Sequence, residues 1–132
     1  MEQIKFSLYN SVGSKEKVDI LCTDYCEMII KGKYQDLVLN ARAVKKDEAK
    51  YKALKQKMPC ITGSAIMNQG EKNKANIQQL NGLIVLDIDD DVNLELVNKI
   101  NADQYTYISH RSFGGDGLCV FIKINPNKFL ES

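Results

Sequence analysis

The sequence predicts an α+β fold in which helices pack on a mixed or antiparallel sheet. Two observations support this prediction. Short stretches alternate apolar and polar residues with a period of two, which is typical of half-buried strands, and longer stretches between them carry apolar residues at helical spacing. Because these helices and strands interleave without a regular strand-helix-strand rhythm, the pattern does not indicate a parallel α/β sheet.

The N-terminal part is predicted to contain two strands and a helix. Residues 3–11 alternate apolar and polar side chains, and residues 17–22 do so more weakly, which predicts a strand over each range. A helix is expected over residues 24–31. The hydroxyl of Thr23 is in position to cap its start, and Gly32 is in position to end it.

Two helical stretches and a bend are expected next. Residues 34–57 have helical spacing with lysines on the opposite face, and the pattern predicts a break near Asp47 and an end at Pro59. Residues 60–67 predict a short strand or a hairpin with a Gly-Ser bend. Residues 71–81 predict a polar loop that runs into a short helix.

The C-terminal part is predicted to alternate strand, helix, strand and strand. The apolar run 83–88 predicts a central strand, followed by a helix over 94–100 and a strand over 105–108. Residues 110–117 predict a glycine-rich loop. This loop leads into a last alternating strand over 118–124.

Length and composition predict a single domain over residues 1–132. A chain of 132 residues can build one core but not two. Its formal net charge of +1 does not indicate any class of binding partner. No run approaches the ~20 apolar residues of a membrane span, and the N-terminus lacks a signal-type apolar segment, so we expect a cytoplasmic protein with no membrane partner. The four cysteines form no CxxC pair, which favours free buried thiols over a zinc site.

The stretch GLIVLDIDDD, residues 82–91, ends an apolar strand in four carboxylates. In a strand, Asp87 and Asp89 point to the same face with Cα atoms roughly 6.5–7 Å apart, a separation at which both could bind a divalent cation. Mg²⁺ fits such oxygen ligands and shares its remaining positions with water and phosphate. The alternative is that the acids at 89–91 only solvate the strand end and favour the next helix N-terminus. Asp87 favours the metal, because it lies inside the apolar run, where an unpaired buried carboxylate is costly.

The stretch SHRSFGGDG, residues 109–117, predicts a second functional element. Glycines let a backbone approach phosphate closely, successive N–H groups can form an anion-binding nest, and an arginine offers a planar fork for phosphate oxygens. The alternative is an ordinary hairpin loop that needs positive φ angles. The candidate phosphate-binding residues are His110, Arg111, Ser112, Gly114, Gly115 and Gly117.

A basic stretch precedes these elements. It could be the solvated face of amphipathic helices, or it could bind a nucleic-acid backbone without sequence preference. Its nine basic residues are Lys31, Lys33, Arg42, Lys45, Lys46, Lys50, Lys52, Lys55 and Lys57.

The strand LIVLDID and the glycine loop that leads into GLCVFIKI together resemble the catalytic core of archaeo-eukaryotic-type primases and primase-polymerases. The resemblance is closer to the small primase-related N-terminal domain of the VirE N-terminal type. That domain precedes helicase or other replication modules in proteins of Bacteroidetes, phages and mobile elements. The resemblance covers most of the chain from about Lys31 onward and implies an RRM-related, primase-polymerase-like core.

The resemblance also implies roles for individual residues. The two acids of the first motif, which bind catalytic Mg²⁺ or Mn²⁺, correspond to Asp87 and Asp89. The histidine of the second motif, which contacts nucleotide phosphate, falls on Cys119, so it is missing from its place, and His110 lies earlier in the loop. A third acid on a later strand has no counterpart, since Glu131 is nearly terminal. We therefore expect an N-terminal fragment that lacks the last acidic motif.

Three functions follow as hypotheses. The first is a nucleotidyltransferase-type domain of DNA replication that binds metal, nucleotide and DNA, either single-stranded or as a primer-template. The second is a catalytically inactive module that uses the lysine face to bind DNA or a replication partner, such as a downstream helicase. The third is a phosphatase of the haloacid dehalogenase type, with Asp87 as nucleophile and Asp89 as acid/base, although only ~40 residues follow for its remaining motifs.

Overall fold

An α+β fold is present in the computed structural model, which describes residues 3–89 and 91–124. These residues form four α-helices and three small antiparallel sheets, which confirms the predicted fold class. The chain divides at Asn81 and Gly82 into two compact units. The prediction of one domain over the whole chain stays a prediction, and each unit is described by itself.

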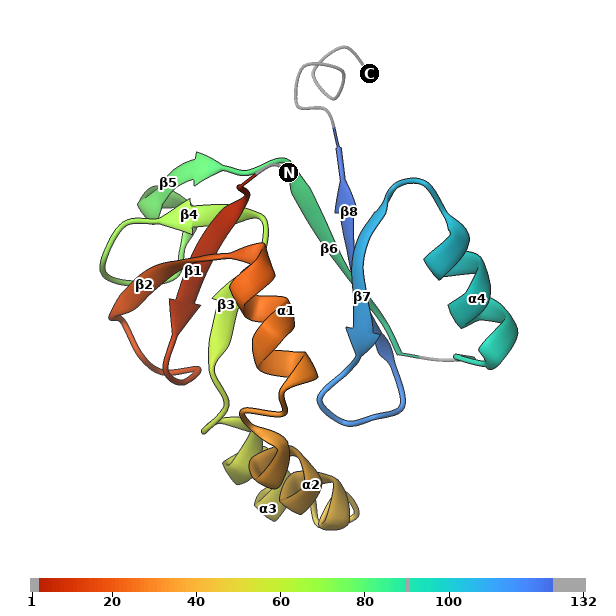
Figure 1. The fold of residues 1–132 in the computed structure, drawn as a ribbon. Coiled ribbons are helices and arrows are strands. Elements are labelled where there is room, and N and C mark those ends of the chain that lie inside the picture. Colours follow the sequence, from red (N-terminus) through yellow and green to blue (C-terminus); the bar gives the residue numbers. More distant parts are fainter. Residues whose placement is uncertain (1–2, 90, 125–132) are drawn as a thin grey trace. The chain divides into compact units, whose positions relative to one another are not determined.

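The first sheet of the first unit has the strand order β2-β1-β3 (Figure 1). Its strands are β1 (Lys5–Tyr9), β2 (Lys17–Leu21) and β3 (Cys60–Thr62), and both pairings are antiparallel. Phe6, Ser7 and Tyr9 are fully buried. Since Phe6 and Ser7 point to opposite faces, β1 is buried on both faces, as the middle strand of a covered sheet should be.

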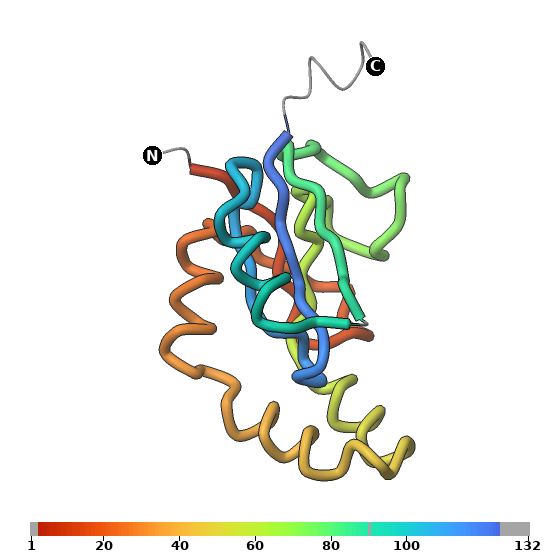
Figure 2. The backbone as a smooth tube through the Cα atoms, turned by 90° about the vertical axis from the view of Figure 1, so that its right-hand side faces the viewer, coloured from red at the N-terminus to blue at the C-terminus, as the bar shows by residue number. Residues whose placement is uncertain are grey.

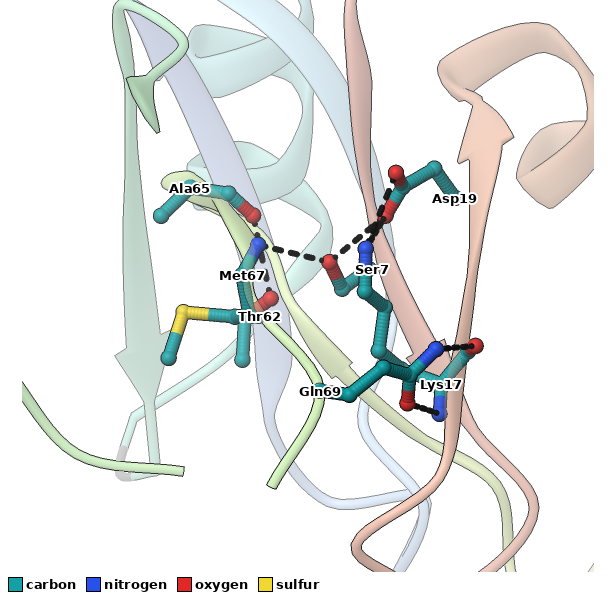
Figure 3. A network of polar contacts seen from close by, with 7 residues as sticks. All are labelled: Ser7, Lys17, Asp19, Thr62, Ala65, Met67 and Gln69. Carbon is teal, nitrogen blue, oxygen red and sulfur yellow. Dashed lines mark hydrogen bonds and ion pairs between the residues drawn. The ribbon is translucent and has the colours of Figure 1, made fainter. Parts of the chain in front are cut away.

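The hydroxyl of Ser7 links β1 to two other strands (Figure 3). It donates a hydrogen bond to Asp19 Oδ1 at 2.9 Å and accepts one from the backbone N–H of Met67 at 2.8 Å. The Lys17 ammonium pairs with the same carboxylate at 2.8 Å. The side-chain amide of Gln69 accepts from the N–H of Lys17 and donates to its carbonyl, at 3.0 and 2.9 Å. The two bonds of the Ser7 hydroxyl satisfy a group that would otherwise be costly to bury, whereas the bonds between Lys17 and Gln69 are exposed.

Helix α1 (Cys22–Ile30) starts two residues earlier than a cap at Thr23 would place it. The N-cap residue is Leu21, with no side-chain cap bond, and Thr23 lies inside the helix, so the prediction that Thr23 caps it is wrong. The predicted end is confirmed. Gly32 has φ 66° and donates to the carbonyl of Ile29, while Lys33 donates to Met28, which together form a Schellman motif.

Helices α2 (Gln35–Ala43) and α3 (Glu48–Lys55) contact each other and are joined by a short turn (Figure 2). The predicted break near Asp47 is confirmed. Asp47 is the N-cap of α3, where its carboxylate accepts a hydrogen bond from the N–H of Lys50 at 3.2 Å. A side chain that caps a new helix ends the preceding helical pattern, because the N-cap residue is itself extended.

The second sheet consists of β4 (Ala65–Met67) and β5 (Ile77–Leu80), which pair antiparallel. Two predictions fail here. The hairpin alternative for residues 60–67 is wrong, because β3 and β4 belong to different sheets. The short helix expected within 71–81 shrinks to the 3₁₀ turn Lys74–Asn76, and β5 follows it. All four residues of β5 are exposed, so no buried face produced the alternation that predicts a strand.

The second unit contains a three-stranded sheet in the order β6-β8-β7, with α4 beside it (Figure 1). The elements are β6 (Leu83–Ile88), α4 (Leu94–Ala102), β7 (Thr106–Arg111) and β8 (Leu118–Lys123). Strand β7 extends beyond its predicted end, so His110 and Arg111 lie in the strand and not in the loop. Throughout the described ranges, no helix has the length and hydropathy that a membrane crossing requires.

Candidate functional site

Asp87 lies near the end of β6, at an edge of the sheet as far as the structure describes it. The residue is exposed, and its neighbour Leu86 is 42% exposed. The expectation that Asp87 is buried in the apolar run is therefore wrong. The run is apolar because one side of the strand packs in the unit, whereas the carboxylate reaches water at the strand end. An exposed carboxylate is available to a cation without a large desolvation cost.

Asp87, Cys119 and His110 form a row across the sheet. Asp87 of β6 lies opposite Cys119 of β8, and Cys119 lies opposite His110 of β7. Directly opposite residues in an antiparallel pair share a face, with Cβ atoms about 4.5–5.5 Å apart. The acid and the histidine that the sequence placed in separate motifs are therefore on one face, about 10 Å apart across two strand spacings.

Cys119, in the middle of this row, is a poor nucleophile. Burial, and after it the charge of Asp87, raises the pKa of the Cys119 thiol to about 11. At neutral pH the thiol is therefore protonated, and only a thiolate attacks efficiently. The carboxylate contributes to the shift because it destabilises a second negative charge beside it. The row thus contains an acid and a histidine with an inert thiol between them.

His110 is oriented by the backbone that follows it. Its Nδ1 lies 2.7 Å from the carbonyl oxygen of Arg111. Because a carbonyl only accepts, Nδ1 donates, and the neutral ring keeps Nε2 as its acceptor nitrogen. The ring also packs at 6.3 Å, centroid to centroid, from that of Phe121, which is fully buried. The imidazole is thus positioned on the face that carries Asp87.

The glycine loop connects β7 and β8 as a closed hairpin turn. Ser112 donates its N–H to the carbonyl of Gly117, and Gly117 donates its N–H to the Ser112 hydroxyl, at 3.0 and 3.1 Å. Gly115 has φ 86° and donates to the carbonyl of Ser112. These bonds occupy two N–H groups of the predicted nest, those of Gly115 and Gly117. They favour the hairpin interpretation for these two glycines.

Gly117 is required by a close approach to β6. A Cβ atom at this position would lie 2.5 Å from the carbonyl oxygen of Ile88, a distance that no side chain tolerates without a backbone shift. Gly117 thus holds the loop against the end of the strand that carries Asp87. Arg111 is exposed and pairs with Leu118, and because neighbouring strand residues alternate, it starts on the face opposite His110.

The acidic stretch after β6 leads into a capped helix. Asp89 and Asp91 are exposed, and Asp90 lies outside the described residues. Asn93 caps α4 by accepting from the N–H of Leu96 at 2.8 Å, so the cap needs none of the preceding acids. Over residues 3–89 and 91–124, no three Cys, His, Asp or Glu side chains gather closely enough to hold a metal by themselves. Metal binding through Asp87 and Asp89 would need further ligands from water or a bound nucleotide.

The sequence did not predict the row, although a signal for it is present. Ser112 and Gly117 close the loop, and counting outward from them pairs Arg111 with Leu118 and His110 with Cys119.

The phosphatase hypothesis finds no support in this sheet. That fold places its acids on a parallel, doubly wound sheet, whereas both pairings of β6, β7 and β8 are antiparallel. Glu131 lies outside the described residues.

The family model of BT4734-like N-terminal domains matches residues 53–128 of the chain. The matched range contains β6, α4, β7 and β8, and with them Asp87, Cys119 and His110. No curated protein matches the chain significantly. No solved structure does so either.

Proposed function

Because the chain belongs to the family of BT4734-like N-terminal domains, we propose that it is a replication-associated domain of primase-polymerase type. In this proposal the face of the β6-β8-β7 sheet that carries Asp87 binds a divalent metal together with nucleotide phosphate. The proposal rests on the resemblance of the acidic strand and the glycine loop to that superfamily. Its structural support is the row of Asp87, Cys119 and His110.

The separation within the row suits a ligand with two charged parts. Asp87, with Asp89 after it, offers exposed carboxylate oxygens, which Mg²⁺ or Mn²⁺ prefers. His110, two strands away, is too distant to share a small cation with Asp87 directly. In this proposal it contacts a phosphate that extends from such a cation. A bound metal would neutralise the two acids and stabilise the charge that develops on phosphate.

The proposal gives two roles to the residues that follow His110: phosphate binding and folding of the loop. Arg111 starts on the opposite face at the exposed end of β7, so to hold a phosphate oxygen its long side chain would have to extend past the strand end to the face of the row. Ser112, Gly114, Gly115 and Gly117 would keep the loop closely folded, with phosphate approaching its backbone. Nucleotide and DNA are the proposed partners.

A non-catalytic DNA- or partner-binding module is the second candidate, and Cys119 favours it. The superfamily histidine would donate to phosphate from this position. The Cys119 thiol cannot become a cation as an imidazole can; with its pKa raised to about 11 it stays protonated and donates only weakly. In this version the domain keeps its fold and recruits DNA or a replication module such as a helicase, without turnover.

The deciding experiment is a calorimetric titration of Mn²⁺ into the full chain, with and without a nucleoside triphosphate. We expect metal binding that strengthens when nucleotide is present and that is lost in the Asp87→Ala, Asp89→Ala variant. The matched control is Glu16→Ala, Glu95→Ala, which removes two other exposed acids and leaves the net charge equal to that of the test variant.

Circular dichroism of each variant establishes that it is folded. If the folded wild type takes up no Mn²⁺ under either condition, the metal-binding proposal fails. Equal losses in the test and control variants would also contradict it, because they would show only a general effect of negative charge. Binding of a DNA oligonucleotide without any metal response would support the recruitment module in its place.

A further inference from the structure

The junction of α2 and α3 in the first unit carries a basic hollow whose lining includes no residue of the row of Asp87, Cys119 and His110. The hollow has a volume of about 600 Å³. It is lined by seven residues from the end of α2, the turn and the start of α3, and four of the seven are basic. These residues are Arg42, Ala43, Val44, Lys45, Lys46, Asp47 and Lys50.

The one acid of the lining is engaged in the fold. Asp47 accepts the N–H of Lys50 with one carboxylate oxygen, and its other oxygen lies 3.9 Å from the Lys50 ammonium. This exposed pair is weak, and a single carboxylate cannot balance four basic side chains. Four basic side chains and one carboxylate therefore line the hollow.

The lining identifies the kind of ligand. Ala43 and Val44 are its only apolar members, and it contains no aromatic side chain. Binding at a membrane surface is strengthened by an apolar group that inserts beside the charges, and base stacking needs an exposed ring. A compact set of lysines and an arginine without either of these matches the phosphodiester backbone, which is bound through charge and without sequence preference.

We propose that this hollow is a binding site for the backbone of nucleic acid. The inference rests on the proposed nucleic-acid partner of the domain but not on its metal site. Of the nine basic residues in the stretch 31–57, it assigns nucleic-acid binding to the four that line the hollow. Lys52, Lys55 and Lys57, further along and after α3, are exposed basic residues that do not line the hollow.

The test compares two pairs of lysines with equal charge. A fluorescein-labelled oligothymidylate of twenty nucleotides is titrated with the full chain, and anisotropy reports binding between 50 and 200 mM salt. We expect Lys46→Ala, Lys50→Ala to weaken binding about fivefold or more. The slope of log K against log salt should fall by about 1.4 in this variant, since each lost phosphate contact on a single strand contributes ~0.7. The control Lys55→Ala, Lys57→Ala should stay within about twofold.

A variant that binds the oligothymidylate more tightly provides an independent test. Asp47→Asn removes the one acid of the lining and keeps a side chain that caps helices well, so it should strengthen binding a few-fold without loss of helix content. Equal weakening by both lysine pairs would overturn the proposal, because it would show a diffuse basic surface. Absence of binding by the wild type would overturn it as well.

The two proposals can fail separately. The Asp87→Ala, Asp89→Ala variant should bind the oligothymidylate as the wild type does, since the hollow belongs to the other unit. A result in which Lys46→Ala, Lys50→Ala loses oligonucleotide but keeps the Mn²⁺ response would support the hollow and leave the metal site intact. A result in which this variant keeps the oligonucleotide and the acid variant loses it would overturn the hollow as the binding site.

Discussion

Asp87 and Cys119 lie directly opposite each other in the ladder between β6 and β8, and the carboxylate contributes to the high pKa of the thiol. This relationship can be measured without any knowledge of function. It also reports on the face where the metal and nucleotide are proposed to bind. A free cysteine thus serves as a probe of the acid beside it.

The substitution Asp87→Asn should lower the pKa of Cys119 and speed its alkylation. Removal of the neighbouring negative charge makes the thiolate easier to form, so the rate with iodoacetamide at pH 8 should rise by at least about twofold. The measurement is peptide mass spectrometry over time. Cys22, whose pKa is also raised to about 11, but by burial and Cys26, is the internal reference and should not change. An unchanged rate at Cys119 would contradict the close approach of the two side chains.

The substitution Gly117→Ala should destabilise the second unit by about 1–3 kcal/mol, the usual cost of overpacking. Its new Cβ would meet the carbonyl oxygen of Ile88 at 2.5 Å. Gly13→Ala is the matched control, because nothing lies within 4 Å of its added Cβ, and it should change stability by less than about 0.5 kcal/mol. Urea unfolding followed by circular dichroism gives both values. Similar stabilities of the two variants would show that the loop does not depend on its contact with β6.

The elements that the sequence predicted well are those with a periodic buried face or a local signal. The apolar run of β6 gave its bounds, Gly32 marked the end of α1, and Asp47 marked the break between α2 and α3. Strand β5 was missed because its four residues are exposed, so its extended conformation depends on pairing with β4 and not on its own pattern. Long-range pairing of this kind leaves no periodic signal in the segment itself.

The candidate site was predicted as residues but not as an arrangement. The sequence singled out Asp87 because it is an acid within an apolar run. Whether its side chain is buried or exposed depends on its position near the end of the strand, which the run does not reveal. His110 was assigned to the loop, because the three glycines and the serine after it mask the end of β7. Its position beside Cys119 depends on where the hairpin closes, and the hydrogen bonds of Ser112 and Gly117 decide that.

The substitution Ser7→Ala should destabilise the first unit by about 1–3 kcal/mol, because it leaves the buried N–H of Met67 without its acceptor. The fully buried hydroxyl also loses its bond to Asp19. Ser14→Ala is the control, since the hydrogen bonds of that hydroxyl are local and exposed, and it should cost less than about 0.5 kcal/mol. Hydrogen exchange of the Met67 amide gives a second readout, which should accelerate in Ser7→Ala alone.

The carboxylate of Asp19 should make stability depend on acid pH. Partial burial raises its pKa, but hydrogen bonds from Lys17 and Ser7 and the charges of Lys17 and Lys5 outweigh burial, so the pKa lies below the ordinary value of an aspartate. A carboxyl whose pKa is lower in the folded chain stabilises the fold above its unfolded pKa of about 3.9, and that contribution is lost as pH falls through the folded value. Asp19→Asn should flatten this loss in unfolding free energy between pH 5 and pH 2, as urea titrations at each pH can show. An equally steep loss in the variant would assign the dependence to other carboxyl groups.

The substitution Cys119→His tests whether the face that Cys119 shares with Asp87 is a nucleotide site that lacks one group. It places an imidazole between Asp87 and His110, at the position where the resembling superfamily has its phosphate-binding histidine. The affinity for Mn²⁺ in the presence of a nucleoside triphosphate should rise about threefold or more over that of Cys119→Ser, which carries a small polar side chain without a ring. Because an imidazole with a pKa of ~6.5 becomes a cation at low pH, the gain over Cys119→Ser should be larger at pH 6 than at pH 8. Calorimetry at both pH values measures it. Equal affinities of the two variants at both pH values would show that no phosphate reaches this row, and the metal and nucleotide site would then have to be sought away from β8.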